Sequence, residues 1–134
     1  RGLITGLTRD SGQYDIVRAA LESVAYQSVD LFKAMKKDGL KPNLIKVDGG
    51  MSKNIWFNQF LSNVLNLKVM TSKTHETTAL GAALIAGYGA GIFKTLSQLS
   101  KKSRVNMQFF PKMNKKNRLK LLNGWNQAIR KTIK

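Results

Sequence analysis

Helical and extended segments alternate along this chain, and that alternation limits the folds open to it more than any other property. Apolar residues recur at helical spacing in 15–37, 52–65 and 78–90, and two short apolar runs, 44–47 and 67–70, separate these segments. Such alternation favours an α/β fold with a parallel sheet. Two strands make too small a sheet for an independent unit. We therefore expect an incomplete sheet with flanking helices, forming part of a larger domain.

The segments outside this alternation are shorter or more polar. Residues 2–8 are predicted to be extended, 95–101 to form a short helical turn and 105–110 to be extended again. A basic helix is predicted from about 114 to 133, with five apolar residues on one face: Leu119, Leu122, Trp125, Ile129 and Ile133.

Composition excludes several kinds of site. The chain has 134 residues, enough for one core, and no cysteine, which excludes a disulfide scaffold, a thiolate metal site and a cysteine nucleophile. His75 is the single histidine, so a multi-histidine metal cluster is excluded, and we expect it to be a loop residue. The absence of cysteine fits a reducing compartment, and we expect a cytoplasmic protein.

The net charge of +16 is uneven along the chain. Residues 77–134 hold 12 basic and no acidic residues. A basic half of this kind can indicate a nucleic-acid surface. The 17 lysines against 6 arginines argue the other way, because nucleic-acid sites favour arginine and stacked aromatic residues. We expect no nucleic-acid partner.

Residues 77–93 form an uncharged run that falls just short of a bilayer span. Its many alanines and glycines favour close approach to a neighbouring backbone, so we predict a buried helix and no membrane span. The chain begins at Arg1 without an initiator methionine or a signal peptide, and we expect it to come from the middle of a longer protein.

The segment with the clearest potential for ligand binding is 45–54, where a strand leads through Gly49 and Gly50 into a helix. Glycines let a ligand pass close to the backbone, and a helix start offers free N–H groups and a positive dipole end. Ser52 is the predicted N-cap, and Asn54 would lie on the first helical turn, facing the same crevice. A tight structural corner is the alternative interpretation. The segment is not a P-loop, because no Gly-Lys-Ser/Thr follows.

Other conspicuous residues have structural interpretations. Asp48 is predicted to cap a backbone N–H in the turn, and Glu76 to complement the dipole of the helix that follows it. The glycine-rich residues 87–91 end a helix rather than follow a strand, so they are not a dinucleotide motif. Trp56 and Trp125 lie at core-facing helical spacing and are predicted to pack in the core.

Several of these segments together resemble one protein family. Gly2-x-Ile4-x-Gly6-Leu7 and, seven residues later, Asp15-Ile16-x-x-Ala19-Ala20-Leu21-Glu22 resemble the second signature of the FGGY carbohydrate kinases. The later motifs resemble the branch of that family that phosphorylates glycerol; they are Val47-Asp48-Gly49-Gly50-x-x-x-Asn54, Gln59-Phe60 and Glu76-x-Thr78-Ala79-Leu80-Gly81-Ala82-Ala83. The resemblance covers nearly the whole chain and weakens after Phe110.

The resemblance implies a fold, a reaction and a site. Residues 1–134 would be the C-terminal portion of the family's C-terminal domain, the second half of a ribonuclease H-like, actin-like ATPase fold. Members of this branch transfer the γ-phosphoryl group of ATP to glycerol with Mg²⁺. Gly49 belongs to the family's adenosine motif, and Gly50 and Asn54 match positions that contact the adenine nucleotide.

The resemblance also implies what this chain lacks. The family's catalytic aspartate, glycerol contacts and phosphate loop would precede Arg1, so no catalytic or metal-binding residue is assigned to the chain, and the piece alone is predicted to be inactive. Its expected partners are the remainder of the same polypeptide and, at full length, further copies of the enzyme. Two alternatives stay open: an FGGY kinase for another sugar, such as a xylulokinase-like enzyme, or a non-enzymatic basic module that binds nucleic acid.

Overall fold

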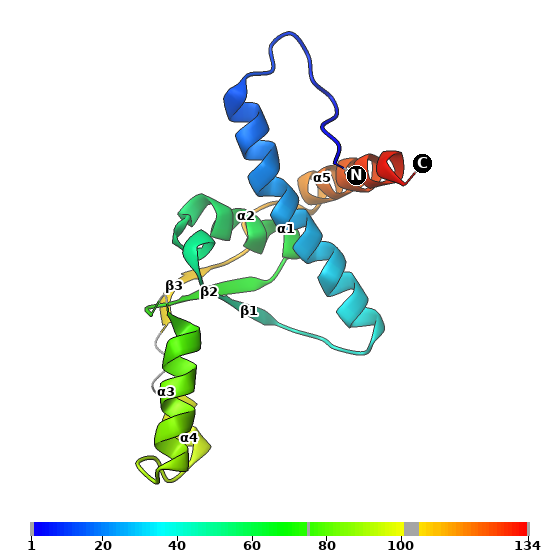
Figure 1. Ribbon diagram of the computed structural model, residues 1–134. Helices are drawn as coiled ribbons and strands as arrows, with labels where there is room; N and C mark the ends of the chain where they lie inside the picture. The colour runs from blue at the N-terminus through cyan, green and yellow to red at the C-terminus, as the bar shows by residue number, and fades with distance from the viewer. Residues whose placement is uncertain (1, 75, 101–104, 134) are drawn as a thin grey trace.

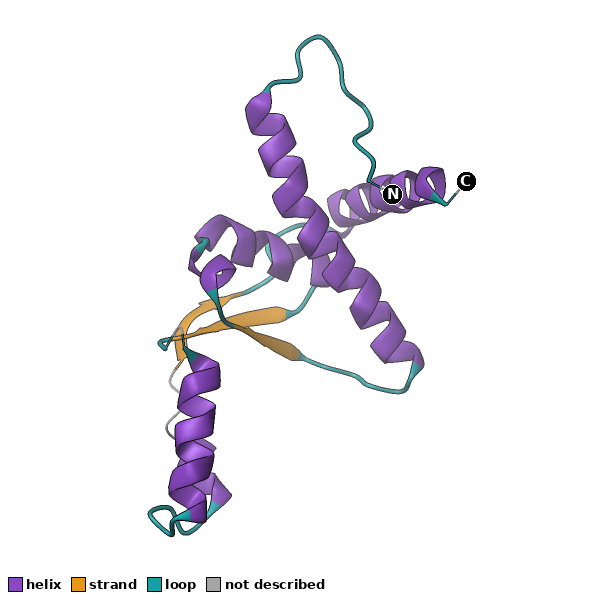
Figure 2. Ribbon diagram, in the orientation of Figure 1, coloured by secondary structure: helices purple, strands orange, loops and turns teal. Residues whose placement is uncertain are grey.

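The computed structural model describes residues 2–74, 76–100 and 105–133, and in them a three-stranded sheet is flanked by helices (Figures 1 and 2). Strand β1 pairs in parallel with β2, and β2 pairs antiparallel with β3. His75, predicted to be a loop residue, lies outside the described residues. The elements are, in chain order, α1 (Gln13–Lys37), β1 (Leu44–Val47), the 3₁₀ turn η1 (Gly50–Lys53), α2 (Ile55–Leu65), β2 (Lys68–Ser72), α3 (Thr77–Gly89), α4 (Leu96–Ser100), β3 (Val105–Phe109) and α5 (Lys115–Thr132).

The predicted α/β alternation is confirmed, and the count of strands is corrected. The extended segment predicted near residues 105–110 is a third strand, β3, which makes the sheet mixed rather than purely parallel. Its side chains alternate between more exposed and more buried positions, which is the period of a half-buried strand. Strand β2 also runs on to Ser72, into a segment that was predicted to be a loop.

The core lies between the sheet and the two helices α1 and α2. Val64 on α2 and Val69 on β2 are almost completely buried in it. Tyr26 of α1 meets Phe60 of α2 edge to face, with ring centroids 5.6 Å apart, and stacks on Trp125 of α5 at 5.5 Å. These aromatic contacts hold three helices together above one face of the sheet.

A hydrogen bond joins α5 to α1 beside this aromatic cluster. The indole Nε1 of Trp125 donates to Asp30 Oδ2 at 2.6 Å, and Lys33 Nζ donates to the other carboxylate oxygen at 2.9 Å. Burial disfavours the charged carboxylate, but these two donors outweigh it, so the pKa of Asp30 is lowered from its ordinary value. Burial and the hydrogen bond to Glu22 raise the pKa of Tyr26 well above its ordinary range.

The uncharged helix α3 was predicted to be buried, and within this chain that prediction is wrong. It projects away from the sheet, and α4 returns along it (Figure 1). Among the described residues of α3, Gly87 alone is buried, and Ile85 is 62% exposed. A Cβ atom at Gly87 would lie 2.9 Å from the Phe93 ring, so the small residue permits the close packing expected where the helix ends.

Two further packing predictions need correction. Trp56 is 41% exposed; it stacks on Phe60 and lies under the Arg18 guanidinium, 5.7 Å from its ring centroid, instead of entering the core. Leu119 on α5 and Ile133, the residue after its end, are exposed, so the predicted apolar face is only partly covered. No helix in the described part of the chain is long and apolar enough to cross a bilayer.

Candidate nucleotide-binding turn

The turn between β1 and α2 has the geometry that two glycines permit. Gly49 has φ +80°, a conformation that L side chains rarely adopt, so glycine is required there for the backbone itself. Gly50 begins η1, and a Cβ atom built on it meets no atom within 4 Å. The fold therefore leaves open space at Gly50, in which a ligand can approach the backbone.

The structure corrects the cap of the helix that follows. Asn54, not Ser52, is the N-cap of α2, and its Oδ1 accepts a hydrogen bond from Phe57 N at 3.0 Å. Ser52 lies inside η1, where its Oγ donates to Gly49 O at 2.7 Å. Because of the intervening 3₁₀ turn, the α-helix begins two residues later than predicted. The spacing of apolar residues does not locate a helix start to within one or two residues.

Asn54 keeps part of its side chain free. The residue is exposed, and none of the described residues accepts a hydrogen bond from its Nδ2 group. A side-chain amide has two donors as well as an acceptor. Asn54 can thus cap the helix through its oxygen and still offer its nitrogen to a ligand above the turn.

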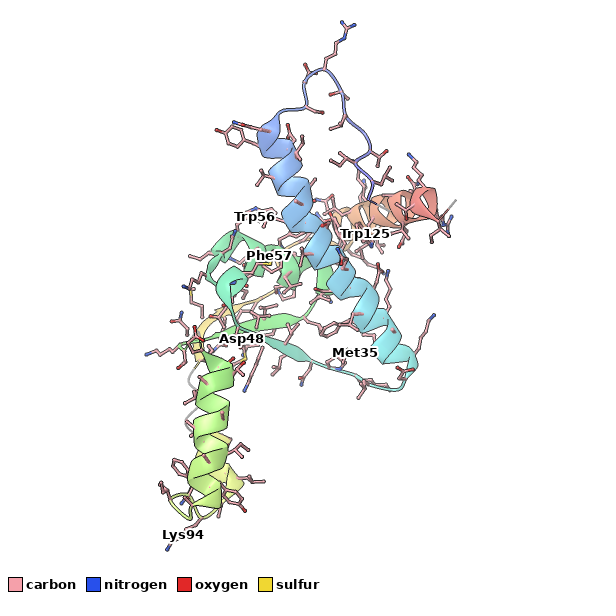
Figure 3. The ribbon with its side chains drawn as sticks, in the orientation of Figure 1. Met35, Asp48, Trp56, Phe57, Lys94 and Trp125 are labelled. Atoms are coloured by element: carbon pink, nitrogen blue, oxygen red, sulfur yellow. The ribbon has the colours of Figure 1, made fainter. Side chains whose placement is uncertain are left out.

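A cavity of about 280 Å³ opens beside this turn, at the edge of the sheet. The carboxyl ends of the parallel strands β1 and β2 and the first residue of α3 meet there, which is where ligands bind in open α/β sheets. Figure 3 shows Asp48 at the base of α3. The lining residues are Lys46, Val47, Asp48, Met70, Thr71, Ser72, Thr77 and Val105.

The predicted site residues differ in whether they line this cavity. Asp48 lines it, and the predicted cap of a backbone N–H by its side chain is not found among the described residues. Gly49, Gly50 and Asn54 follow on the adjoining turn and are absent from the lining. Glu76 is the residue before α3, as predicted, although its side chain caps no backbone N–H.

Sequence reasoning missed the polar lining of the cavity. Thr71 is 3% exposed, and its Oγ1 accepts a hydrogen bond from Met107 N at 3.1 Å. Ser72 and Thr77 complete a hydroxyl-bearing wall between β2 and α3. The signal was present, because polar residues that follow an apolar strand next to another parallel strand are expected at one shared edge.

A larger hollow, of about 490 Å³, lies on the other side of α1. The N-terminal segment around Ile4, the helix α1 and the helix α5 enclose it, and Tyr26 and Trp125 form part of its wall. None of the glycines of the turn contributes to it, so it is separate from the candidate site.

The described residues include no group of three or more His, Cys, Asp or Glu side chains that could hold a metal ion. Among the residues that line the cavity beside the turn, Asp48 is the one carboxylate. Mg²⁺ usually binds through one or two carboxylates together with substrate phosphates rather than in a cage made of protein alone.

Comparison with known proteins agrees with the fold and identifies a family. Residues 1–90 match the FGGY family of carbohydrate kinases, C-terminal domain. Glycerol kinase of Gluconobacter oxydans is 46% identical over 134 residues, and that of Coxiella burnetii strain RSA 493 is 44% identical over 133. Each alignment covers 99% of this chain and 26% of the relative, so the chain spans about a quarter of the relatives' length.

Solved structures show the same arrangement. Plasmodium falciparum glycerol kinase, crystallised with ADP, superposes with a TM-score of 0.86 at 36% identity and covers 97% of this chain and 26% of its own. Xylulose kinase of Lactobacillus acidophilus superposes with a TM-score of 0.81 at 26% identity, covering 99% of this chain and 27% of its own.

The sheet, its covering helices and the glycine turn define the class: the chain is part of an α/β domain with the actin-like ATPase fold. Within that class it belongs to the FGGY family of carbohydrate kinases, in the C-terminal domain of that family. The resemblance seen in the sequence motifs is thereby confirmed, and the relatives named glycerol kinase align over nearly the whole chain.

Proposed function

We propose that residues 1–134 are the C-terminal portion of a glycerol kinase and form one wall of its ATP site. The complete enzyme would transfer the γ-phosphoryl group of ATP to glycerol and give glycerol 3-phosphate. The observation that carries this proposal is the open turn at Gly50, between a strand and a helix, in a chain 46% identical to a glycerol kinase. The relative crystallised with ADP supports a nucleotide as the ligand.

Each residue of the turn has a distinct role in this proposal. Gly49 supplies the backbone conformation, and Gly50 leaves room for the adenosine part of the nucleotide. Asn54 presents its free Nδ2 donor beside the start of α2. The site residues of this chain are therefore Gly49, Gly50 and Asn54, and they bind and orient the nucleotide rather than react with it.

The remaining chemistry belongs to segments that this chain does not contain. Phosphoryl transfer depends on holding the γ-phosphate, Mg²⁺ and the attacking hydroxyl in line. We assign no catalytic residue here, and we expect the remainder of the polypeptide to supply the base, the glycerol contacts and the phosphate loop. We further propose that the complete enzyme is cytoplasmic and forms a homo-oligomer.

The uncovered helix α3 supports the proposal that a further part of the polypeptide packs on this chain. Its residues are apolar all round and carry no charge, a pattern typical of helices that are covered on every side. The chain spans 26% of its relatives' length, which leaves ample polypeptide to cover α3.

A kinase for a different sugar is the second candidate. Structures of a xylulose kinase and a gluconate kinase, both from Lactobacillus acidophilus, superpose with TM-scores of 0.81 and 0.79, each at 26% identity. The adenosine side of the site would serve either substrate equally. Activity measured with glycerol, xylulose and gluconate on the complete enzyme distinguishes these candidates.

The test of the nucleotide site is Gly50→Leu in the complete enzyme. We expect the KM for ATP to rise tenfold or more, about 1.4 kcal/mol of binding, because the new side chain occupies the open space. Gly124→Leu is the matched control, since Gly124 on α5 also has open space around it but lies away from the turn. An unchanged KM for ATP in Gly50→Leu would remove the turn from the site.

A second measurement concerns the chain by itself. In a coupled assay with ATP, Mg²⁺ and glycerol, residues 1–134 should show no turnover, whereas the complete enzyme should be active. Turnover by the isolated chain near the rate of the complete enzyme would show that the catalytic groups lie within it.

A further inference from the structure

A buried side-chain amide on α2 contacts the backbone of the turn between β1 and α2. Asn58 on α2 is completely buried, and its Nδ2 donates to Ser52 O at 2.7 Å. Its Oδ1 is equally buried and accepts no hydrogen bond from any described residue. An amide that is only half satisfied in a core is unusual, because burying a polar group without a partner costs free energy.

The residue that Asn58 holds is itself tied to the turn. Ser52 is 5% exposed, its Oγ donates to Gly49 O at 2.7 Å, and its backbone N donates to the same oxygen at 3.2 Å. Hydrogen bonds thus connect the first turn of α2 through η1 to the glycine with φ +80°. We call the residues Asn58, Ser52 and Gly49 the turn relay.

The turn relay stabilises the conformation of the turn more than it stabilises the fold as a whole. An apolar side chain of similar volume at position 58 would remove the unpartnered Oδ1 and fill the same space. What such a side chain would lose is the hydrogen bond to Ser52 O, which anchors η1 against α2. The amide therefore acts locally, because it stabilises the backbone conformation beside Gly50.

We infer that Asn58 and Ser52 are positioning residues, which hold the Gly49–Gly50 turn in the form that accepts the adenosine group. This inference rests on the proposed function. Both side chains are buried and would act through the backbone of the turn, without touching the nucleotide. When the turn is already ordered, nucleotide binding does not have to offset the conformational entropy lost on ordering the turn.

The experiment compares two buried hydroxyl groups on the same polypeptide. Ser52→Ala removes the bond to Gly49 O, and Asn58→Leu removes the bond to Ser52 O. The control is Ser62→Ala, because Ser62 is fully buried on α2 and donates to Leu67 O at 2.7 Å, away from the turn. Ser52→Thr keeps the hydroxyl and should restore the behaviour of the unmodified enzyme.

In the complete enzyme we expect Ser52→Ala and Asn58→Leu each to raise the KM for ATP about three- to tenfold, the range of one lost hydrogen bond. The kcat and the KM for glycerol should stay unchanged. Without nucleotide, hydrogen–deuterium exchange of the Ser52 and Asn54 amides should accelerate in both variants. Ser62→Ala should lower thermal stability without changing either the KM for ATP or that exchange.

The outcomes separate the two proposals. If Gly50→Leu raises the KM for ATP while Ser52→Ala and Asn58→Leu leave it unchanged, the turn relay has no positioning role and the nucleotide site stands. If Gly50→Leu also has no effect, the site is wrong and this inference falls with it. Should Asn58→Leu fail to fold, the comparison of Ser52→Ala with Ser52→Thr decides the matter.

Discussion

Helices α2 and α3 are both free of charged residues, and they have opposite surroundings. Seven of the eleven residues of α2 are buried, among them Val64 and Leu61, which are 1% and 2% exposed. In α3 Gly87 alone is buried, and Ile85 is 62% exposed. Figure 2 shows the reason: α2 lies against the sheet, whereas α3 leaves its edge and extends outward.

The difference shows that an apolar sequence indicates that a helix is packed against other segments, but not which segments pack against it. On α2 the buried residues occupy a wide arc of the helix surface, and α1 and the sheet both pack against it. On α3 apolar residues occur all round, which is typical of a helix enclosed by several neighbours. Most of α2 is buried by segments of this chain, although Ile55 and Trp56 at its start stay exposed. For α3, we propose that polypeptide beyond this chain provides the cover.

Truncation of the α2 core should have the largest effect. Leu61→Ala in the complete enzyme should lower the free energy of unfolding by about 2–5 kcal/mol, because it opens a cavity between α1, α2 and the sheet. Denaturant unfolding measures the loss. Leu119→Ala, at a 45% exposed position on α5, should change it by less than about 0.5 kcal/mol. Equal losses would show that this core does not limit stability.

Ile85→Ala tests whether α3 is covered in the complete enzyme. We expect a loss of about 2 kcal/mol, the low end of the range for such truncations, because the side chain would be packed against the remainder of the polypeptide. A loss below about 0.5 kcal/mol, like that of Leu119→Ala, would mean that α3 projects into solvent in the complete enzyme as well.

The glycine turn lies where the two regions meet, and its two glycines should respond differently. Gly49→Ala places an L side chain at φ +80° and should cost about 1–2 kcal/mol of stability. Gly50→Ala adds a methyl group in open space and should be nearly neutral in the same unfolding measurement. Equal costs at the two positions would contradict the assignment of backbone strain to Gly49.

The smallest effect is expected at the contact between α1 and α5. Trp125→Phe removes the donor to Asp30 and should cost about 1 kcal/mol at pH 7. The pKa of Asp30 is lowered in the folded state, so its contribution is present above the unfolded pKa of about 4 and is lost as pH falls through the folded value. The cost of Trp125→Phe should therefore shrink at acidic pH.

Unfolding at pH 7 and at about pH 3 measures this change. Trp56→Phe is the control, because Trp56 stacks on Phe60 and forms no hydrogen bond with a carboxylate of the described residues. A cost of Trp125→Phe that is the same at both pH values would show that the ionised Asp30 is not its relevant partner.

Much of the candidate site was predictable, because residues close together in the sequence determine the conformation of the turn. An apolar strand, two glycines and a polar helix start predict a turn with open backbone, and the structure has that turn at Gly49 and Gly50. The N-cap was misplaced by two residues, since a 3₁₀ turn and a helix start have similar local patterns. The buried amide of Asn58 was not predicted, because it is one of four polar residues on α2, with Gln59, Ser62 and Asn63, and no local pattern shows which of them is buried.

By itself, the sequence determined which segments are helical or extended, where α1 and α3 end, and the family to which the chain belongs. Those properties depend on periodicity, turn residues and motif spacing, all of which act over a few neighbouring positions. Only the tertiary structure decided that β3 pairs antiparallel with β2, that Trp125 of α5 reaches Asp30 of α1, and that α3 is left uncovered. Each of these depends on contacts between residues far apart along the chain, and a local pattern carries no information about which distant partner will supply them.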